Sequence, residues 1–205
     1  MRVEIAGVSV AFSGREVLNV ASALFVDGGI CGIVGPSGSG KSSLLSVIAG
    51  LRAPDTGTVV FSQDGQRRKP SRDDVAWVPQ GAYLLPERSV ADNVAIGALA
   101  EGVELAAAME RAEAALEQVG MRDRVAATAS VLSGGETQRV ALARAICMSR
   151  PIIIADEPTA SLDREAAQNV ADVLGRLQDE RLIIVATHDP LLMEQCDTLL
   201  DLGAR

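Results

Sequence analysis

Eight consecutive residues, Gly35-Pro36-Ser37-Gly38-Ser39-Gly40-Lys41-Ser42, combine glycines with a lysine and a serine hydroxyl. Glycine leaves the backbone free to bend and its N–H groups open toward an anion. A lysine beside such a turn reaches the β- and γ-phosphates of a nucleotide, and a serine hydroxyl there binds Mg²⁺. The pattern therefore predicts a phosphate-binding loop, with a chance glycine-rich turn as the alternative.

The flanking segments favour the phosphate-binding interpretation. Residues 30–34 are apolar and predict a buried strand, while Leu44, Leu45 and Ile48 fall on one face of a predicted helix that stops at Gly50. A loop that leads from a strand into a helix points N–H groups and the positive end of the helix dipole at the bound phosphates.

Two carboxylates, Asp156 and Glu157, follow the continuous apolar run 151–155. Such a run is typical of a strand inside a parallel sheet, whose carboxyl edge is where these sheets bind ligands. We expect Asp156 to hold the hydration shell of Mg²⁺ and Glu157 to orient the water that attacks the γ-phosphate. An ordinary Asp-Glu pair at a helix start is the alternative.

Two further polar residues follow predicted strands. His188, the only histidine, comes after the apolar run 182–186, so it is expected at the same sheet edge and in contact with the γ-phosphate. A structural histidine is the alternative. Gln80 follows a predicted strand at 74–78 and is a candidate donor to the attacking water or to a metal-bound oxygen.

The stretch Leu132-Ser133-Gly134-Gly135-Glu136 is a second unusual turn at a helix start. Ser133 and Glu136 have the spacing of a capping box. The two glycines leave N–H groups open at the helix N-terminus, which also fits an anion site. The stretch is therefore either an ordinary cap or a second phosphate site that serves a nucleotide held by a partner.

Composition limits the class of protein. A chain of 205 residues with 48% apolar content can bury one domain with a sizeable core. A net charge of −8 argues against a general nucleic-acid surface. No apolar run approaches the ~20 residues of a membrane span and the start lacks a signal peptide, so a soluble, cytosolic protein is expected. Cys31, Cys147 and Cys196 are interpreted as buried free thiols rather than metal ligands or disulfides.

The remaining pattern changes from strands to helices along the chain. The front reads as antiparallel strands, with expected segments at 3–12, around Val17 and Leu18, at 24–26 and at 58–62. Residues 81–132 read as a mainly helical insertion, with helices at 91–99 and 104–119. The last part alternates helix and strand, with helices at 163–177 and 191–195 and a closing strand at 198–202. The expected buried face of the 104–119 helix is Leu105, Met109, Ala112, Leu116 and Val119.

Six of these motifs occur in the order found in the ATP-binding subunits of ABC transporters, which the whole chain, 1–205, resembles. The phosphate loop resembles Walker A, residues 152–157 resemble Walker B, and 132–136 resemble the LSGGE signature. Gln80, Ser161-Leu162-Asp163 and His188 resemble the Q-loop, the D-loop and the switch histidine.

The resemblance implies an α/β P-loop NTPase with a RecA-like core, an antiparallel β subdomain and a helical signature subdomain. It implies ATP hydrolysis with Mg²⁺ and a head-to-tail dimer, either with a second copy or with a homologous subunit. Two ATP molecules then lie between Walker A of one chain and the signature of the other. It also implies an integral-membrane permease as partner, which places the chain on the inner face of the cell membrane.

Motifs and resemblance together define three groups of candidate residues. Catalytic roles are expected for Glu157, His188, Gln80 and Lys41. Contacts to Mg²⁺ are expected from Ser42, Gln80 and Asp156. Nucleotide contacts are expected from Phe12, Gly35, Pro36, Ser37, Gly38, Ser39, Gly40, Lys41, Ser42, Ser43, Ser133, Gly134, Gly135, Glu136 and Asp163.

Some positions depart from the family pattern or leave a choice open. Phe12 stands where the family often stacks a tyrosine on adenine, and Thr137 replaces a longer polar residue. Residues 84–94 are similar to the lipoprotein-release, macrolide-export and cell-division subunits. Tyr83, Leu84 and Leu85 are interpreted as a contact for the permease or as a small satellite core.

Two other classes of protein share parts of the pattern. P-loop kinases have a similar phosphate loop but lack the signature and the switch histidine. The ATPase heads of DNA-repair proteins share the signature but carry coiled-coil or zinc-binding insertions, which the acidic charge and scattered cysteines do not fit.

Overall fold

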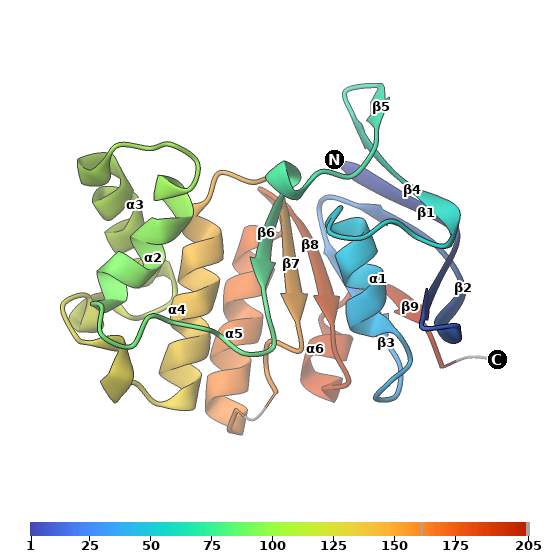
Figure 1. Ribbon diagram of the computed structural model, residues 1–205. Helices are drawn as coiled ribbons and strands as arrows, with labels where there is room; N and C mark the ends of the chain where they lie inside the picture. The colour runs from blue at the N-terminus through green and yellow to red at the C-terminus, as the bar shows by residue number, and fades with distance from the viewer. Residues whose placement is uncertain (161, 204–205) are drawn as a thin grey trace. The chain divides into compact units, whose positions relative to one another are not determined.

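Apolar runs from distant parts of the chain assemble the sheet that carries the phosphate loop (Figure 1). The computed structural model describes residues 1–160 and 162–203. Strand β3 (Ile30–Val34) lies in a five-stranded sheet of order β6-β7-β8-β3-β9 and pairs in parallel with β8 and β9. The other strands are β6 (Val75–Val78), β7 (Ile152–Asp156), β8 (Leu182–Ala186) and β9 (Thr198–Asp201). Every residue of β3, β7 and β8 is buried, as the apolar runs predict.

The front of the chain forms an antiparallel sheet of order β2-β1-β4-β5. Its strands are β1 (Arg2–Phe12), β2 (Arg15–Val26), β4 (Thr56–Gln63) and β5 (Gln66–Arg68). The prediction of two segments, around Val17 and at 24–26, is wrong because β2 is one continuous strand. Register shifts along β1 let β1 and β2 stay paired where their sequences are irregular.

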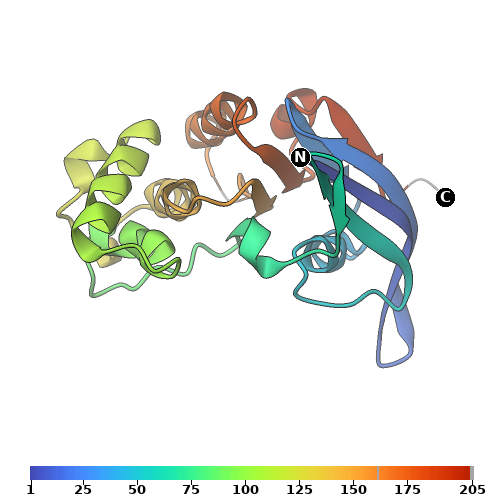
Figure 2. The same cartoon turned by 90° about the horizontal axis from the view of Figure 1, so that it is seen from above.

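The antiparallel sheet and the phosphate-loop helix share one core. Helix α1 (Lys41–Ile48) buries Leu44, Leu45 and Ile48, the face expected from the sequence. These side chains pack with inward residues of β1, among them Val3 and Val8. Figure 2 shows β1, β2 and β4 curving beside this helix.

The chain divides into two compact units. The first is Met1–Trp77, Arg150–Glu157 and Leu174–Arg205, and the second is Val78–Ser149 and Pro158–Val173. The described residues of the predicted insertion, 81–132, hold α2 (Val90–Leu99), α3 (Leu105–Gln118) and two 3₁₀ turns. The second unit also includes α4 (Gly134–Cys147), while α5 (Arg164–Leu177) begins in it and ends in the first. Helix α6 (Pro190–Glu194) belongs to the first unit.

Helix α3 and the residue after it keep only part of the expected buried face, since Ala112, Leu116 and Val119 are buried but Leu105 and Met109 are not. Leu105 is 64% exposed and Met109 is only partly buried, whereas Ala108 and Ala115 are fully or almost fully buried beside Ala112 and Leu116. Small alanine side chains let α3 approach its neighbours closely, so alanines displace the larger residues from the buried stripe. The helix ends before Gly120, whose φ of 68° fits the expected glycine stop.

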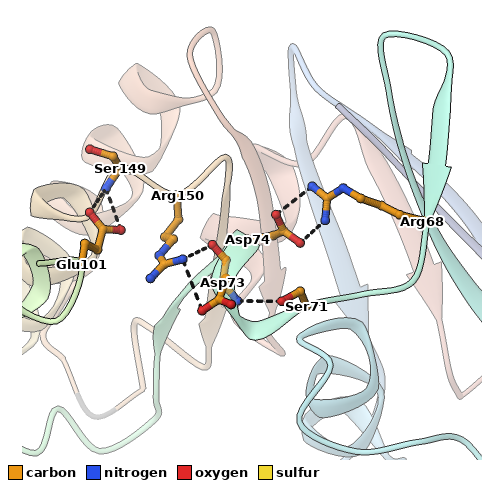
Figure 3. Close-up of polar contacts among 7 residues, drawn as sticks. All are labelled: Arg68, Ser71, Asp73, Asp74, Glu101, Ser149 and Arg150. Atoms are coloured by element: carbon orange, nitrogen blue, oxygen red, sulfur yellow. Dashed lines mark hydrogen bonds and ion pairs between the residues drawn. The ribbon is translucent and has the colours of Figure 1, made fainter.

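Polar contacts fix the segments where the chain passes from one unit to the other (Figure 3). In the first unit the Arg68 guanidinium forms a two-point ion pair with Asp74, and Arg150 contacts Asp73. In the second unit the Glu101 carboxylate accepts the Ser149 N–H, with oxygens at 3.0 and 3.2 Å.

The remaining expectations concern the thiols and the membrane. All three cysteines are free; Cys31 and Cys147 are buried, but Cys196 is only half-buried, which corrects the expectation of burial for that residue. None of the described helices is both long and apolar enough to cross a bilayer.

Candidate active site

The loop between β3 and α1 adopts backbone angles that require its glycines. Gly35, Gly38 and Gly40 have φ of 147°, 82° and 94°. A Cβ on Gly40 would lie 2.5 Å from the Val17 carbonyl oxygen, so only glycine fits there. The loop thus leads directly into the N-terminus of α1, the arrangement that binds phosphate.

Lys41 is held across the loop by three acceptors. Its Nζ donates to the carbonyl oxygens of Gly35 at 3.0 Å and Pro36 at 3.4 Å, and lies 3.2 Å from Oε1 of Glu157. The residue is only 7% exposed. The positive charge that the sequence assigns to the phosphates is therefore placed inside the loop, next to the expected catalytic carboxylate.

Glu157 joins the lysine to the histidine. Its Oε2 lies 2.8 Å from Nδ1 of His188 and accepts the His188 backbone N–H at 3.3 Å. Its own N–H donates to the Ala186 carbonyl at 2.8 Å, and its φ of 49° is unusual for a residue other than glycine. Such strain persists only where neighbouring structure fixes it, and it gathers at functional sites. His188 is at the expected sheet edge, with its side chain 68% exposed.

Asp156 and Ser42 form the candidate Mg²⁺ site. Asp156 is 7% exposed, and its Oδ1 has no hydrogen-bond partner among the described residues. Burial raises the pKa of this carboxyl, while a hydrogen bond with Ser42 acts in the opposite direction. Mg²⁺ prefers one or two protein oxygens together with phosphates and water. A buried carboxylate oxygen without a partner, close to a serine hydroxyl, fits that preference.

A cleft of about 940 Å³ adjoins the phosphate loop. It is lined by the start of β2 from Arg15 to Asn19, by Pro36 to Ser39, and by Leu202 and Gly203. The Ser39 hydroxyl is buried and has no hydrogen-bond partner among the described residues. Such a group needs an explanation, and binding a phosphate oxygen would supply its partner. The volume is in the range that nucleotide-sized ligands occupy.

Phe12, the expected adenine contact, is 50% exposed at the end of β1. The Arg52 guanidinium carbon lies 4.0 Å from the centroid of its ring. Nothing in the local spacing of Arg52 links it to Phe12, so this contact could not be predicted from the sequence. Arg15 was not predicted either, although the Ser13-Gly14 turn indicates that it lies opposite Phe12 in a hairpin.

The signature serine and glutamate form the capping box of α4. The Ser133 Oγ accepts the Glu136 N–H at 3.3 Å, and the Glu136 Oε2 accepts the Ser133 N–H at 2.9 Å. These bonds, with help from Arg124, lower the pKa of Glu136. The cap is confirmed, and the phosphate-binding role of this turn stays a prediction. Gly134 faces open space, whereas a Cβ on Gly135 would lie 3.0 Å from the Ala166 Cβ.

The other expected residues divide between the units. Lys41, Ser42, Asp156, Glu157 and His188 come together in the first unit. Gln80, which is exposed, the signature and Asp163 belong to the second. Asp163 accepts the Ala166 N–H at 2.8 Å, while Ser161 lies outside the described residues.

Comparison with known proteins identifies the family. The model of the family described as ABC transporter matches residues 18–160. The lipoprotein-releasing system ATP-binding protein LolD of Saccharophagus degradans is 38% identical over 92% of this chain and 87% of its own length. The LolD protein of Roseobacter denitrificans is 36% identical over 98% of this chain and 95% of its own length.

Solved structures give the same result. The ATP-binding cassette MJ0796, a dimer bound to ADP and Pi in a post-hydrolysis state, superposes with a TM-score of 0.85. It is 27% identical and covers 98% of this chain and 94% of its own. A bacterial Atm1-family ABC exporter with ATP bound gives a TM-score of 0.81 at 27% identity, over 98% of this chain and 37% of its own. The chain therefore belongs to the ABC transporter family, as an ATP-binding cassette with the α/β fold of a P-loop NTPase.

Proposed function

We propose that this chain binds and hydrolyses ATP as the ATP-binding subunit of an ABC transporter of the lipoprotein-release type. The family match and the names of the LolD relatives support the proposal. The observation that carries the hydrolytic part is the contact series Lys41–Glu157–His188 beside the phosphate loop. This series supports assigning Lys41 as the phosphate-binding cation, Glu157 as the general base and His188 as a polar contact to the γ-phosphate.

Each residue of the first unit has a separate task. The loop N–H groups and the residues from Gly35 to Ser43 hold the phosphates, and Lys41 moves from Glu157 to the β- and γ-phosphates. Glu157 then has a free carboxylate oxygen with which to orient and deprotonate the attacking water. His188 keeps the other oxygen of Glu157 in place through its backbone N–H and Nδ1, and its Nε2 donates toward the γ-phosphate when the imidazole carries both protons.

Ser42 and Asp156 are the first-unit residues that would hold Mg²⁺. When bound, Mg²⁺ neutralises the charge that develops on the phosphate oxygens. Gln80 is the proposed further contact from the second unit. Phe12 is the proposed stacking surface for the base.

The second unit is proposed to complete the site of another chain. The Ser133 and Glu136 side chains are occupied with the helix cap. The first N–H groups of a helix have no partner within the helix, and here these include the N–H groups of Gly134 and Gly135. We propose that these groups, with Asp163, contact ATP held by a second copy or by a homologous subunit.

The permease is the proposed membrane partner, which would hold the chain at the inner face of the cell membrane. Tyr83 is 78% exposed and Leu85 is 48% exposed, which favours a partner contact over a satellite core. Replacing both with Ser should uncouple transport and leave the basal ATPase rate unchanged. Loss of basal activity would contradict this role.

The variant Glu157→Gln tests the proposed base. It should bind ATP but hydrolyse it about 10²- to 10⁴-fold more slowly. Because ATP then persists, the variant should dimerise on adding MgATP, as measured by gel filtration with light scattering. Glu180→Gln, an exposed glutamate of the first unit, is the matched control and should behave as wild type. Near-normal turnover of Glu157→Gln would contradict the assignment.

A further inference from the structure

Phe12 and Arg52 lie far apart in the sequence but form one stacked pair. The Arg52 guanidinium carbon is 4.0 Å from the centroid of the Phe12 ring. Half of the Phe12 surface is still exposed, and the Arg52 side chain is 29% exposed. A guanidinium at this distance is attracted to the electron-rich face of the ring. One face of the ring is thus covered by Arg52, and the opposite face remains available.

The same arginine also holds the backbone next to Phe12. Its Nη2 donates to the Ala11 carbonyl oxygen at 2.7 Å. The Asp55 Oδ2, 3.6 Å from that nitrogen, accepts the Ala11 N–H at 2.7 Å. Both polar groups of the preceding residue are therefore fixed by the Arg52–Asp55 pair, which limits the motion of the Phe12 backbone as well as of its ring.

The hairpin pairs Phe12 with a residue that lines the cleft. Phe12 pairs with Arg15 across the turn Ser13-Gly14, whose φ values of 50° and 79° are those of a two-residue hairpin loop. Directly paired residues of antiparallel strands lie on the same face of the sheet. Arg15 lines the cleft together with phosphate-loop residues, so Phe12 is the direct strand partner of a residue of the cleft wall.

We propose that Arg52 is a positioning residue for nucleotide binding: it holds one face of Phe12 so that the other face is presented to the base. This inference rests on the proposed function. A ring that is fixed before the ligand arrives loses less freedom on binding, and therefore binds the base more tightly. Arg52 itself touches the ring and the Ala11 backbone, and not the nucleotide.

The test compares a ligand that carries the adenine base, ADP, with one that lacks it, pyrophosphate. Calorimetric titrations with Mg-ADP and with magnesium pyrophosphate would be run on wild type, Arg52→Gln, Phe12→Leu and the double variant. Arg52→Gln should weaken Mg-ADP about two- to fivefold, and Phe12→Leu should weaken it at least about fivefold. Neither should change pyrophosphate affinity. The double variant should match Phe12→Leu, because Arg52 acts through the ring.

Two controls separate this effect from loss of charge or of folding. Arg67→Gln removes an exposed arginine that pairs with Glu4, and it should leave both affinities unchanged. Arg52→Lys keeps a cation and a donor for the Ala11 carbonyl, so its Mg-ADP affinity should lie between those of wild type and Arg52→Gln. If Arg52→Gln does not fold, Arg52→Lys alone and combined with Phe12→Leu gives the same comparison.

Several outcomes would overturn the inference. Tighter Mg-ADP binding by Arg52→Gln would mean that Arg52 competes with the base for the ring. Three other results would exclude action through the ring. Arg52→Gln could leave the Mg-ADP affinity unchanged, or it could weaken Mg-ADP and pyrophosphate equally. It could also weaken Mg-ADP further when Phe12→Leu is already present. If the wild-type protein binds neither Mg-ADP nor pyrophosphate, the proposed function itself is wrong. That result differs from failure of the Arg52 role alone, in which the wild-type protein still binds both ligands.

Discussion

Glu157 Oε1 lies 3.2 Å from Lys41 Nζ, and the two residues are only 8% and 7% exposed. Desolvating two charges is costly, and their attraction offsets that cost only while both are present. The two residues assigned to the γ-phosphate are thus each other's ion-pair partner in the protein itself. Their energetic coupling can be measured without ATP.

A double-mutant cycle on this pair should show strong coupling. Lys41→Met alone should lower the free energy of unfolding by about 3 kcal/mol, near the lower end for a broken buried pair, because His188 still contacts Glu157. Adding Glu157→Gln should bring the value back to within about 1 kcal/mol of wild type. Urea unfolding measures the free energy of unfolding of the single and double variants. If the loss in the double variant equals the sum of the two single losses, the pair does not interact appreciably.

Asp156→Asn should stabilise the protein and abolish its response to Mg²⁺. One buried oxygen of Asp156 has no hydrogen-bond partner among the described residues, which destabilises the fold, so a neutral amide should add roughly 0.5–2 kcal/mol. The melting temperature should rise without ligand, but the further rise caused by MgATP over Mg-free ATP should disappear. The exposed Asp179→Asn is the control and should change neither value. A lower melting temperature of Asp156→Asn would contradict the cost assigned to this carboxylate.

Much of the site could be predicted because its signals are local. The phosphate loop, Asp156-Glu157 and His188 each directly follow a strand of continuous apolar residues, and parallel strands align their carboxyl ends. The Ser133 cap was equally readable from short spacing. The Lys41–Glu157 contact could not be predicted, because it depends on how closely β3 and β7 bring their ends together.

What the sequence missed depends on packing between distant segments. The contact of Arg52 with Phe12 has no local pattern, since it arises from the way the loop after α1 meets the β1–β2 hairpin. The first part of the buried face of α3, at Leu105 and Met109, was misplaced for a similar reason. Periodicity alone favours Leu105 over Ala108, and only the close approach of neighbouring helices selects the smaller side chain.

The signature cap predicts a pH-dependent contribution to stability. Glu136→Ala should cost about 0.5–2 kcal/mol at pH 7, because it removes half of the capping box. The pKa of Glu136 is lowered in the folded state by Ser133 and Arg124. The cost should therefore be fully present above the ordinary pKa of 4.5 and decline as the pH falls through the lower folded value.

Chemical unfolding between pH 3 and pH 7 measures this difference between wild type and variant. Glu104→Ala is the matched control, since Glu104 precedes α3 without any side-chain cap. Its effect should stay below about 0.5 kcal/mol and should not change with pH. A cost for Glu136→Ala that grows at low pH would contradict the assigned sign.

The signature turn should act on ATP held by another chain. Gly134 tests this better than Ser133, because a Cβ on Gly134 meets nothing within 4 Å, whereas Ser133 caps α4. Gly134→Asp should keep the fold and place a negative charge where a phosphate is expected, while Gly134→Ser is the neutral control. With Glu157→Gln present to prevent hydrolysis, neither Lys41→Ala nor Gly134→Asp should dimerise alone with MgATP.

Mixing these two variants decides between action in the same chain and action in a partner. If the turn serves a partner's ATP, a heterodimer has one doubly damaged site and one intact site, so MgATP should produce dimers on gel filtration. If both motifs served their own chain's nucleotide, every site in the mixture would carry one defect and only monomers would elute. Differently tagged chains recovered together in the dimer peak would confirm the heterodimer. Gly134→Ser should dimerise with MgATP on its own, which would show that the neutral substitution leaves the contact intact.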